Sequence, residues 1–174
     1  MTIYAIIACD RHGLIGQDHQ LPWHCSEDLQ HFKQLTLGQK VLLGRTTFES
    51  ILERLGRPLP ERHHFVLTHR IGKHFANVVY ESALDLPRFA GEGNLYVIGG
   101  ASVYAQCADF LEVIFLSVIK GNYHGNVYLP DLGSGWFLEK SEDRGSFLLL
   151  ELRRKPKNLC PRLFLWEDLE TIQI

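Results

Sequence analysis

The chain has 174 residues, of which 45% are apolar and 22% charged, with a formal net charge of −2. This length suits one domain with a sizeable core, so we expect a single domain over residues 1–174. The absence of a basic block excludes a nucleic-acid or anionic-membrane surface and indicates a small-molecule ligand. Four widely spaced cysteines and an N-terminus unlike a signal peptide predict buried, reduced thiols, no metal site and a cytoplasmic location.

The chain begins with an apolar run, residues 2–9, that predicts a strand buried on both faces. The segment that follows is rich in Gly, Asp and His and predicts a long loop, and loops of this length in compact domains are usually functional. This loop leads to a short helix, which we expect Ser26 to cap and Gly38 to end.

Further apolar runs predict strands that alternate with short helices: residues 40–44, 63–68, 77–82, 94–100 and 113–119. This alternation is typical of an α/β domain with a mainly parallel sheet. The C-terminal third predicts antiparallel strands at a sheet edge, in residues 137–142, 147–155 and 162–170, with a hairpin tip at 155–161.

Two strands end in glycine directly before a helix, in VLLG-RTTFESIL and YVIGG-ASVYAQC. Glycine lets the backbone approach a phosphate, and a helix N-terminus offers free N–H donors, so two such units suit a dinucleotide. The pattern departs from GxGxxG, and a tight turn alone is the alternative. Arg45 begins the first of these helices, where a cation indicates either a bound anion or a surface ion pair.

A third strand ends in Thr68, His69 and Arg70. An acidic residue at such a position would favour a free ribose hydroxyl, whereas hydroxyl and basic groups favour a 2′-phosphate. The segment therefore favours NADPH, or else it is simply a polar strand end.

Asp28 shares a helix face with Phe32 and Leu35. It either complements the helix dipole or forms a buried site, with Trp23 and Ser117 as hydrogen-bonding partners and a cationic or amidine-like ligand group opposite. Arg62, just before a predicted strand, is a candidate for binding a ligand carboxylate, or else a solvated loop residue.

Taken together, five ordered blocks resemble the dihydrofolate reductase family: GLIGQDHQLPWHCSEDLQHFK, KVLLGRTTFESI, GRPLPERHHFVLTH, LYVIGGASVYAQ and HGNVYLPD. The resemblance implies a single-domain α/β fold, with a mixed, mostly parallel sheet of eight strands flanked by about four helices. It also implies an enzyme that reduces 7,8-dihydrofolate to tetrahydrofolate with NADPH, by hydride transfer to pterin C6 and protonation at N5, and that binds antifolate inhibitors. For a single domain, a monomer is the simplest expectation.

The resemblance assigns catalytic roles to Asp28, Trp23, Leu21 and Ser117. It places the substrate against Ile6, Ala8, Asp28, Leu29, Phe32, Ile51, Leu59, Arg62, Ile98, Tyr104 and Ser117. It places NADPH against Ala8, Ile15, Gly16, Leu21, Gly44, Arg45, Thr46, Thr47, Leu67, Thr68, His69, Gly99, Gly100, Ala101, Ser102, Val103 and Tyr104.

Three departures from the family pattern bear on the site. Ser117 stands where the family usually has Thr, and Asn126 replaces an Asp that helps to hold the mobile loop. The stretch ILERLGRPLP carries extra residues between the helix and Arg57, which leaves open whether Ile51 or Leu55 lines the cleft. Two other functions remain as alternatives: a related pterin or pyrimidine reductase of the same fold, and a non-catalytic nucleotide-binding protein.

Overall fold

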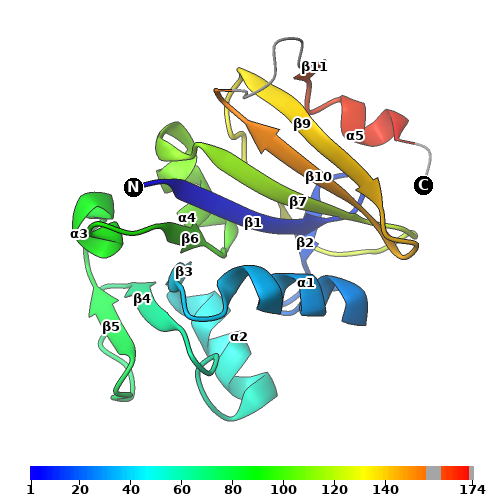
Figure 1. The fold of residues 1–174 in the computed structure, drawn as a ribbon. Helices are drawn as coiled ribbons and strands as arrows, with labels where there is room; N and C mark the ends of the chain where they lie inside the picture. Colours follow the sequence, from blue (N-terminus) through cyan, green and yellow to red (C-terminus); the bar gives the residue numbers. More distant parts are fainter. Residues whose placement is uncertain (156–161, 173–174) are drawn as a thin grey trace.

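A nine-stranded sheet forms the centre of the protein, which is described here by a computed structural model covering residues 1–155 and 162–172. Its strand order is β11-β9-β10-β7-β1-β6-β3-β4-β5 (Figure 1). Six strands from β7 to β5 run parallel: β1 (Ile3–Cys9), β3 (Lys40–Gly44), β4 (His63–Leu67), β5 (Val78–Glu81), β6 (Leu95–Val97) and β7 (Val113–Ile119). Three antiparallel strands extend the β7 edge: β9 (Trp136–Asp143), β10 (Phe147–Arg153) and β11 (Arg162–Phe164). The expected mixed, mostly parallel α/β fold is confirmed.

Helices cover both faces of this sheet. On one face lie α1 (Ser26–Thr36) and α2 (Arg45–Leu55), and on the other lie α3 (Leu86–Ala90), α4 (Ala101–Cys107) and α5 (Asp168–Thr171), with a 3₁₀ turn η1 (Ala108–Phe110) after α4. Alternation along β3 explains the division: Leu42 packs with α3 and α4, whereas Val41 and Leu43 pack with α2. None of the helices in the described part of the chain is long and apolar enough to cross a membrane.

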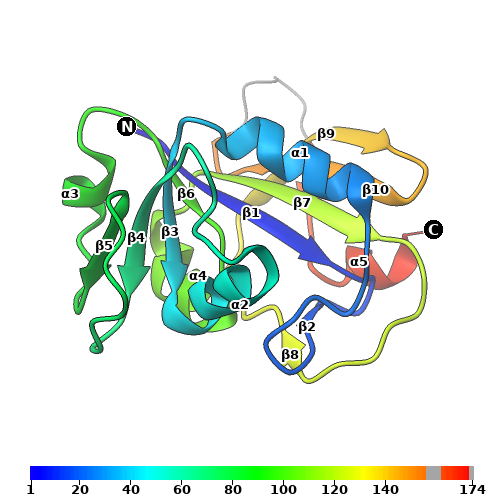
Figure 2. The same ribbon diagram turned by 90° about the horizontal axis from the view of Figure 1, so that it is seen from below.

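The long loop after β1 contains a strand that the sequence pattern did not predict. β2 (Leu14–Gly16) pairs with β8 (Val127–Tyr128), and Figure 2 shows this small pair near the carboxyl end of β1. Two or three residues are too short a run for an alternating pattern to be visible in the sequence.

Two predictions for the C-terminal third need correction. The sheet has nine strands, not eight, because β11 pairs with β9. Residues 162–170 do not form one strand: they divide into β11 and α5, since Trp166, Leu169 and Ile172 recur at helical spacing and pack on the core. The expected hairpin tip at 155–161 lies outside the described residues, apart from Lys155.

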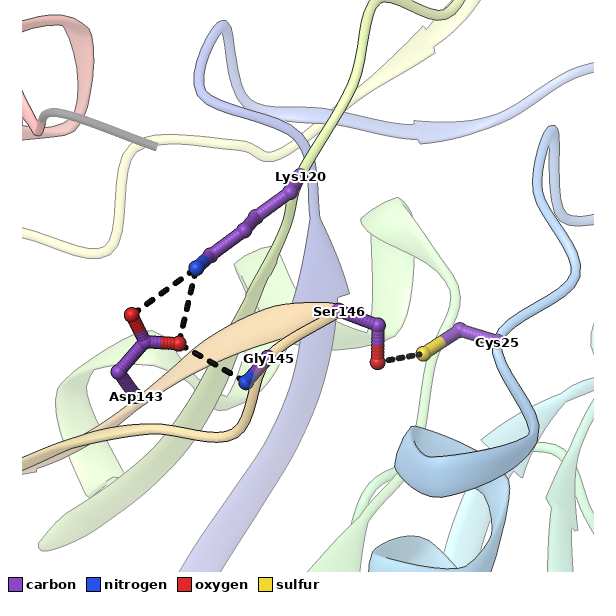
Figure 3. A network of polar contacts seen from close by, with 5 residues as sticks. All are labelled: Cys25, Lys120, Asp143, Gly145 and Ser146. Atoms are coloured by element: carbon purple, nitrogen blue, oxygen red, sulfur yellow. Dashed lines mark hydrogen bonds and ion pairs between the residues drawn. The ribbon is translucent and has the colours of Figure 1, made fainter.

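The start of α1 also differs from the prediction. Ser26 is its first helical residue, and the capping position is Cys25, which provides no side-chain cap. The side chain of Cys25 is instead hydrogen-bonded to the β9–β10 hairpin, with its Sγ 3.4 Å from Ser146 Oγ (Figure 3). The same hairpin is tied to the end of β7 by Lys120, whose ammonium lies 2.8 Å from Asp143 Oδ1. As expected, Gly38 follows the end of the helix, in the left-handed region with φ 72°.

The cysteine prediction is confirmed where the structure describes it. Cys9, Cys25 and Cys107 are buried, free thiols. Burial raises the pKa of Cys107 to about 12, so this thiol stays protonated and unreactive at neutral pH. Cys160 lies outside the described residues.

Candidate active site

A cleft of about 1050 Å³ lies at the carboxyl ends of the parallel strands β1, β3, β4 and β6, where ligands of open α/β sheets bind. It brings together nearly all of the expected site residues: Ile6, Ala8, Ile15, Gly16, Leu21, Trp23, Asp28, Leu29, Phe32, Gly44, Arg45, Thr46, Thr47, Ile51, Leu59, Leu67, Thr68, His69, Ile98, Gly99, Gly100, Ala101, Ser102, Val103 and Tyr104. Ser117 and Arg62 are the two expected residues that do not line it.

Asp28 projects from the first turn of α1 into this cleft and is only 8% exposed. Burial raises the pKa of its carboxyl, and a hydrogen bond from Ser117 opposes that shift. Ser117 lies on β7 opposite Ala8 of β1 and is 1% exposed, so it supports the carboxylate from behind the cleft wall. Asp28 forms no ion pair with any described residue. A buried carboxylate without a cation favours a ligand that supplies positive charge.

Trp23 lines the cleft, but the expected hydrogen bond to Asp28 is absent. Its indole Nε1 is buried and has no partner among the described residues. Its ring packs edge-on against Tyr123, with centroids 5.2 Å apart, and this packing sets its orientation. A buried donor without a partner on the wall of a cleft is a place for a ligand or a bridging water.

Tyr104 joins α4 to the strand at the centre of the cleft. Its hydroxyl donates to the carbonyl oxygen of Ile6 at 2.7 Å. Burial, with smaller effects from Cys9 and Asp28, raises the pKa of Tyr104, so it stays a neutral donor. Gly99 packs against this ring: a Cβ there would lie 3.4 Å from the Tyr104 hydroxyl.

The two strand–glycine–helix units meet at one end of the cleft. Gly44 N donates to Gly99 O at 2.8 Å, and α2 and α4 begin directly after Gly44 and Gly100 without side-chain caps. A Cβ at Gly44 would lie 3.2 Å from Val103 Cγ2, and one at Gly100 would lie 3.2 Å from Thr47 Oγ1. We call the segment around Gly44, Gly99 and Gly100 the phosphate cradle. It is open because glycine has no side chain, and its size suits the phosphates of a dinucleotide.

Of the two predictions for Arg45, a bound anion or a surface ion pair, the structure shows the ion pair. Its Nη1 lies 2.8 Å from Glu49 Oε1, one helical turn on, and its side chain is 42% exposed. An exposed pair of this kind contributes little to stability. Because Arg45 also lines the cleft, its guanidinium remains within reach of an anion bound there.

Hydroxyl and basic groups gather where β4 and β5 end. Thr68, His69 and Arg70 follow β4, and Ser82 follows β5 next to it. All four line the cleft. Ser82 was not among the predicted site residues, although it directly follows a predicted strand, as Thr68 does, and ligands of such sheets bind at the ends of strands.

Arg62 is positioned differently from the prediction. It is 4% exposed and is bound by protein atoms: Nε and Nη2 donate to Thr36 Oγ1, Nη2 also to Lys33 O, and Nη1 to Pro60 O. These bonds join the residue that precedes β4 to the end of α1. Since arginine has five N–H donors, one on Nη1 remains, too few for bidentate recognition of a carboxylate.

Asn126 holds the loop that covers the cleft. Asp18 N donates to Asn126 Oδ1 at 3.1 Å, and Asn126 Nδ2 donates back to Asp18 Oδ1 at 3.0 Å. The backbone N of Asn126 also donates to Gly16 O at 3.1 Å. The replacement of an acid by an amide therefore keeps the loop attached, because Asp18 supplies the matching acceptor.

Several lining residues were missed by the sequence analysis: Ile7, His19, Gln20, His24, Ser50, Glu53, Arg54, Gln106 and Val127. Ser50 and Arg54 share a helix face with Ile51, which was predicted, and this periodicity was the available signal.

The fold and the cleft together define a dinucleotide-dependent oxidoreductase, with a phosphate cradle at one end and a buried carboxylate in the wall. A family model described as dihydrofolate reductase matches residues 2–146. The dihydrofolate reductase of Bacillus subtilis is 36% identical over 140 residues, covering 79% of this chain and 81% of that one. A Staphylococcus aureus dihydrofolate reductase is 32% identical over 166 residues, covering 95% and 96%.

Among solved structures, dihydrofolate reductase from Enterococcus faecalis complexed with NADP(H) and RAB-propyl matches with a TM-score of 0.70 and 26% identity, covering 87% of this chain and 93% of that one. The chain belongs to the dihydrofolate reductase family. It is an NADPH-dependent oxidoreductase that reduces 7,8-dihydrofolate to 5,6,7,8-tetrahydrofolate.

Proposed function

We propose that Asp28 binds and polarises the pterin ring of dihydrofolate, with its carboxylate against the 2-amino group and N3. The observation that carries this proposal is a buried carboxylate on the cleft wall, stabilised by the Ser117 hydroxyl, that has no cationic partner among the described residues. An amidine-like edge supplies two N–H donors in the plane that a carboxylate accepts from, and it supplies the missing positive charge when protonated.

Ser117 and Trp23 position this carboxylate and its ligand. The Ser117 hydroxyl stabilises the ionised form of Asp28 and so keeps its pKa from rising as far as burial alone would move it. Trp23 Nε1 remains available to a water that bridges to the ligand.

The other substrate contacts are apolar. In this proposal the pterin and aminobenzoyl rings lie against Ile6, Ala8, Leu29, Phe32, Ile51, Leu59, Ile98 and Tyr104, all of which line the cleft. Such a wall excludes water and strengthens the interaction of Asp28 with the ring.

NADPH, when bound, supplies the hydride that pterin C6 receives. Gly44, Thr46, Thr47, Gly99, Gly100, Ala101, Ser102 and Val103 would hold its phosphates, and Thr68 and His69 its 2′-phosphate. Ile15, Gly16 and Leu21, with Leu67 on the far side, would enclose the remainder.

The proton for N5 enters beside the loop in this proposal. Leu21 is 41% exposed at the mouth of the cleft, so a water can pass it, and Asp28 raises the basicity of the ring without donating the proton itself. Catalysis by this chain therefore consists of orientation, exclusion of bulk water and one tuned carboxylate.

Arg62 is proposed to contact the α-carboxylate of the substrate's glutamate tail through its one remaining N–H. The chain is also proposed to act as a monomer with one domain over residues 1–174, since strands from residues 3 to 164 share one sheet. A cytoplasmic location is proposed from the family and is consistent with the free thiols Cys9, Cys25 and Cys107.

Absorbance at 340 nm, with purified protein, NADPH and dihydrofolate, tests the activity and its inhibition together. We expect a loss of signal that requires both substrates and that methotrexate abolishes. Turnover that is insensitive to methotrexate would contradict the proposed pterin site, because the inhibitor presents the same amidine-like edge to Asp28.

A further inference from the structure

A second cavity, of about 140 Å³, lies between α1 and the antiparallel end of the sheet. It is separate from the cleft, because the two share no lining residue. Figure 2 shows α1 next to β10 and the β9–β10 hairpin, and the residues around the cavity come from these elements and from β7. They are His31, Phe115, Lys140, Arg144, Leu149 and Glu151.

The imidazole of His31 has an unused hydrogen-bonding group beside this cavity. Its Nε2 is buried and has no partner among the described residues. The ring packs against Phe115 and Phe147, with both centroids 6.4 Å away, and this packing sets its orientation. Burial, together with the positive charge of Arg144, lowers the pKa of His31, and the opposing effect of Glu142 is smaller. The imidazole is therefore neutral at pH 7, and the tautomer with a proton on Nε2 can donate to a polar atom of a ligand.

Two cations lie at the mouth of the cavity. Lys140 Nζ lies 3.0 Å from Glu142 Oε2, and Arg144 Nε lies 2.7 Å from Glu142 Oε1, so the two cations share one carboxylate. Their side chains are 63% and 41% exposed, which leaves both within reach of a ligand that enters from solvent. The acid that lines the cavity, Glu151, is itself paired with Arg153, whose Nη2 lies 2.6 Å from its Oε1. These pairings favour an anion at the mouth, because the lining carboxylate already has its own cation.

The remaining walls are apolar and are formed by Phe115 and Leu149. A cavity of about 150 Å³ with apolar walls is large enough for one benzene ring. We propose that this cavity is a binding site for a small aromatic carboxylate, whose single ring packs on Phe115 and whose carboxylate accepts hydrogen bonds from His31 Nε2 and Arg144. The site gives α1, the helix that carries Asp28, a ligand contact outside the cleft.

Proton NMR of the histidine imidazoles tests this assignment while benzoate is titrated into the complex with NADPH and methotrexate. The two cleft ligands are included so that benzoate meets an occupied cleft, and His31→Asn identifies the His31 signal by its loss. We expect benzoate to shift this signal with a dissociation constant in the millimolar range, which is typical of a ligand with so few atoms. Benzamide has the ring without the charge and acetate has the charge without the ring, so both should bind about fivefold more weakly or worse.

Arg144→Gln and Arg57→Gln form a matched pair of charge-removing variants. Arg57 is an exposed arginine that lines neither cavity. We expect Arg144→Gln to weaken benzoate binding about two- to fivefold, the range of one exposed ion pair, and Arg57→Gln to leave it unchanged.

The protonation of His31 provides a second readout. An anion at Nε2 favours the imidazolium, so benzoate should raise the pKa of His31 and should bind more tightly as pH falls toward that pKa. The charged groups that face this histidine are Lys140, Glu142, Arg144 and Glu151, and a pH titration without benzoate measures their combined effect.

A His31 signal that benzoate leaves unchanged would overturn the proposal. Equal binding of benzoate and either benzamide or acetate would overturn it too, as would an unchanged affinity in Arg144→Gln. Shifts confined to His19 and His24, which line the cleft, would place benzoate in the cleft instead and would also contradict a second site.

Discussion

Two regions close the same cleft by different means. One wall of the cleft contains Trp23, Asp28 and Tyr104, with Ser117 directly behind them, and none of these residues is more than 8% exposed. The covering loop, residues 15–21, is held by the polar contacts of Asn126, and Leu21 at its C-terminal end is 41% exposed. Burial fixes the carboxylate that we propose acts on the pterin, whereas hydrogen bonds between partly exposed groups hold the loop that we propose opens for ligands to enter.

The largest effect should follow a change in the wall. Asp28→Asn keeps the shape but removes the charge that polarises the pterin, so we expect kcat/KM to fall on the order of 10²-fold or more. The loss should grow with pH, because solution protons become scarce while Asp28 of the wild type stays ionised. At acid pH, below its raised pKa, Asp28 is itself neutral and the two proteins should converge. Parallel pH profiles would contradict this role.

A smaller effect is expected in the proposed phosphate cradle, where Gly44, Gly99 and Gly100 meet. Gly100→Ala places a Cβ 3.2 Å from Thr47 Oγ1, so we expect NADPH affinity to fall roughly 5- to 50-fold, the range of overpacking costs. Gly93→Ala is the control, because its Cβ would meet Ala90 O at an ordinary 3.7 Å. Titration of protein fluorescence with NADPH measures both. Equal affinities in the two variants would show that the cradle does not bind phosphate closely.

The loop predicts a still smaller and reversible effect. Asn126→Asp places a carboxylate against the carboxylate of Asp18, so the loop should open more often. We expect the backbone amide of Asp18 to exchange with solvent about fivefold faster, which corresponds to the free energy of one lost hydrogen bond. The swap Asp18→Asn with Asn126→Asp restores a donor and an acceptor and should return exchange to the wild-type rate. If the double variant exchanges as fast as Asn126→Asp alone, the two hydrogen bonds between Asp18 and Asn126 do not hold the loop in place.

The smallest effect concerns the thermal stability of Asp28→Asn, which we expect to rise although its activity falls. Because the folded protein raises the pKa of Asp28, the ionised carboxylate costs folding free energy above that pKa, and this cost disappears as pH falls below it. We therefore expect Asp28→Asn to raise Tm of the ligand-free protein at pH 7 and to leave it unchanged near pH 3. Thermal unfolding at both pH values measures this, and a lower Tm at pH 7 would contradict a desolvated carboxylate.

The comparison also explains what the sequence could and could not predict. β3 and β7 have the expected bounds because continuous apolar runs dictate buried parallel strands. β2, with three residues, and α5, with four, depend on tertiary pairing and packing that no local pattern encodes. Most residues of the cleft could be predicted because they lie in sequence motifs on helices and strands. The hydrogen bond from Arg62 to Thr36 could not be predicted, because it joins residues 26 positions apart and depends on side-chain geometry alone. Arg54 lies outside the strand–glycine–helix motif, and only the helical periodicity of α2 places it on the face that lines the cleft.

The central claim is that Asp28 pairs, as an anion, with the amidine-like edge of the bound ligand. The ultraviolet difference spectrum of methotrexate bound to the wild type and to Asp28→Asn tests it directly, since protonation of the pteridine ring changes its absorbance. We predict that the wild-type complex holds the ring protonated at pH values where free methotrexate is neutral, and that the Asp28→Asn complex holds it neutral. Identical spectra in the two complexes would show that Asp28 does not carry the charge on which this account depends.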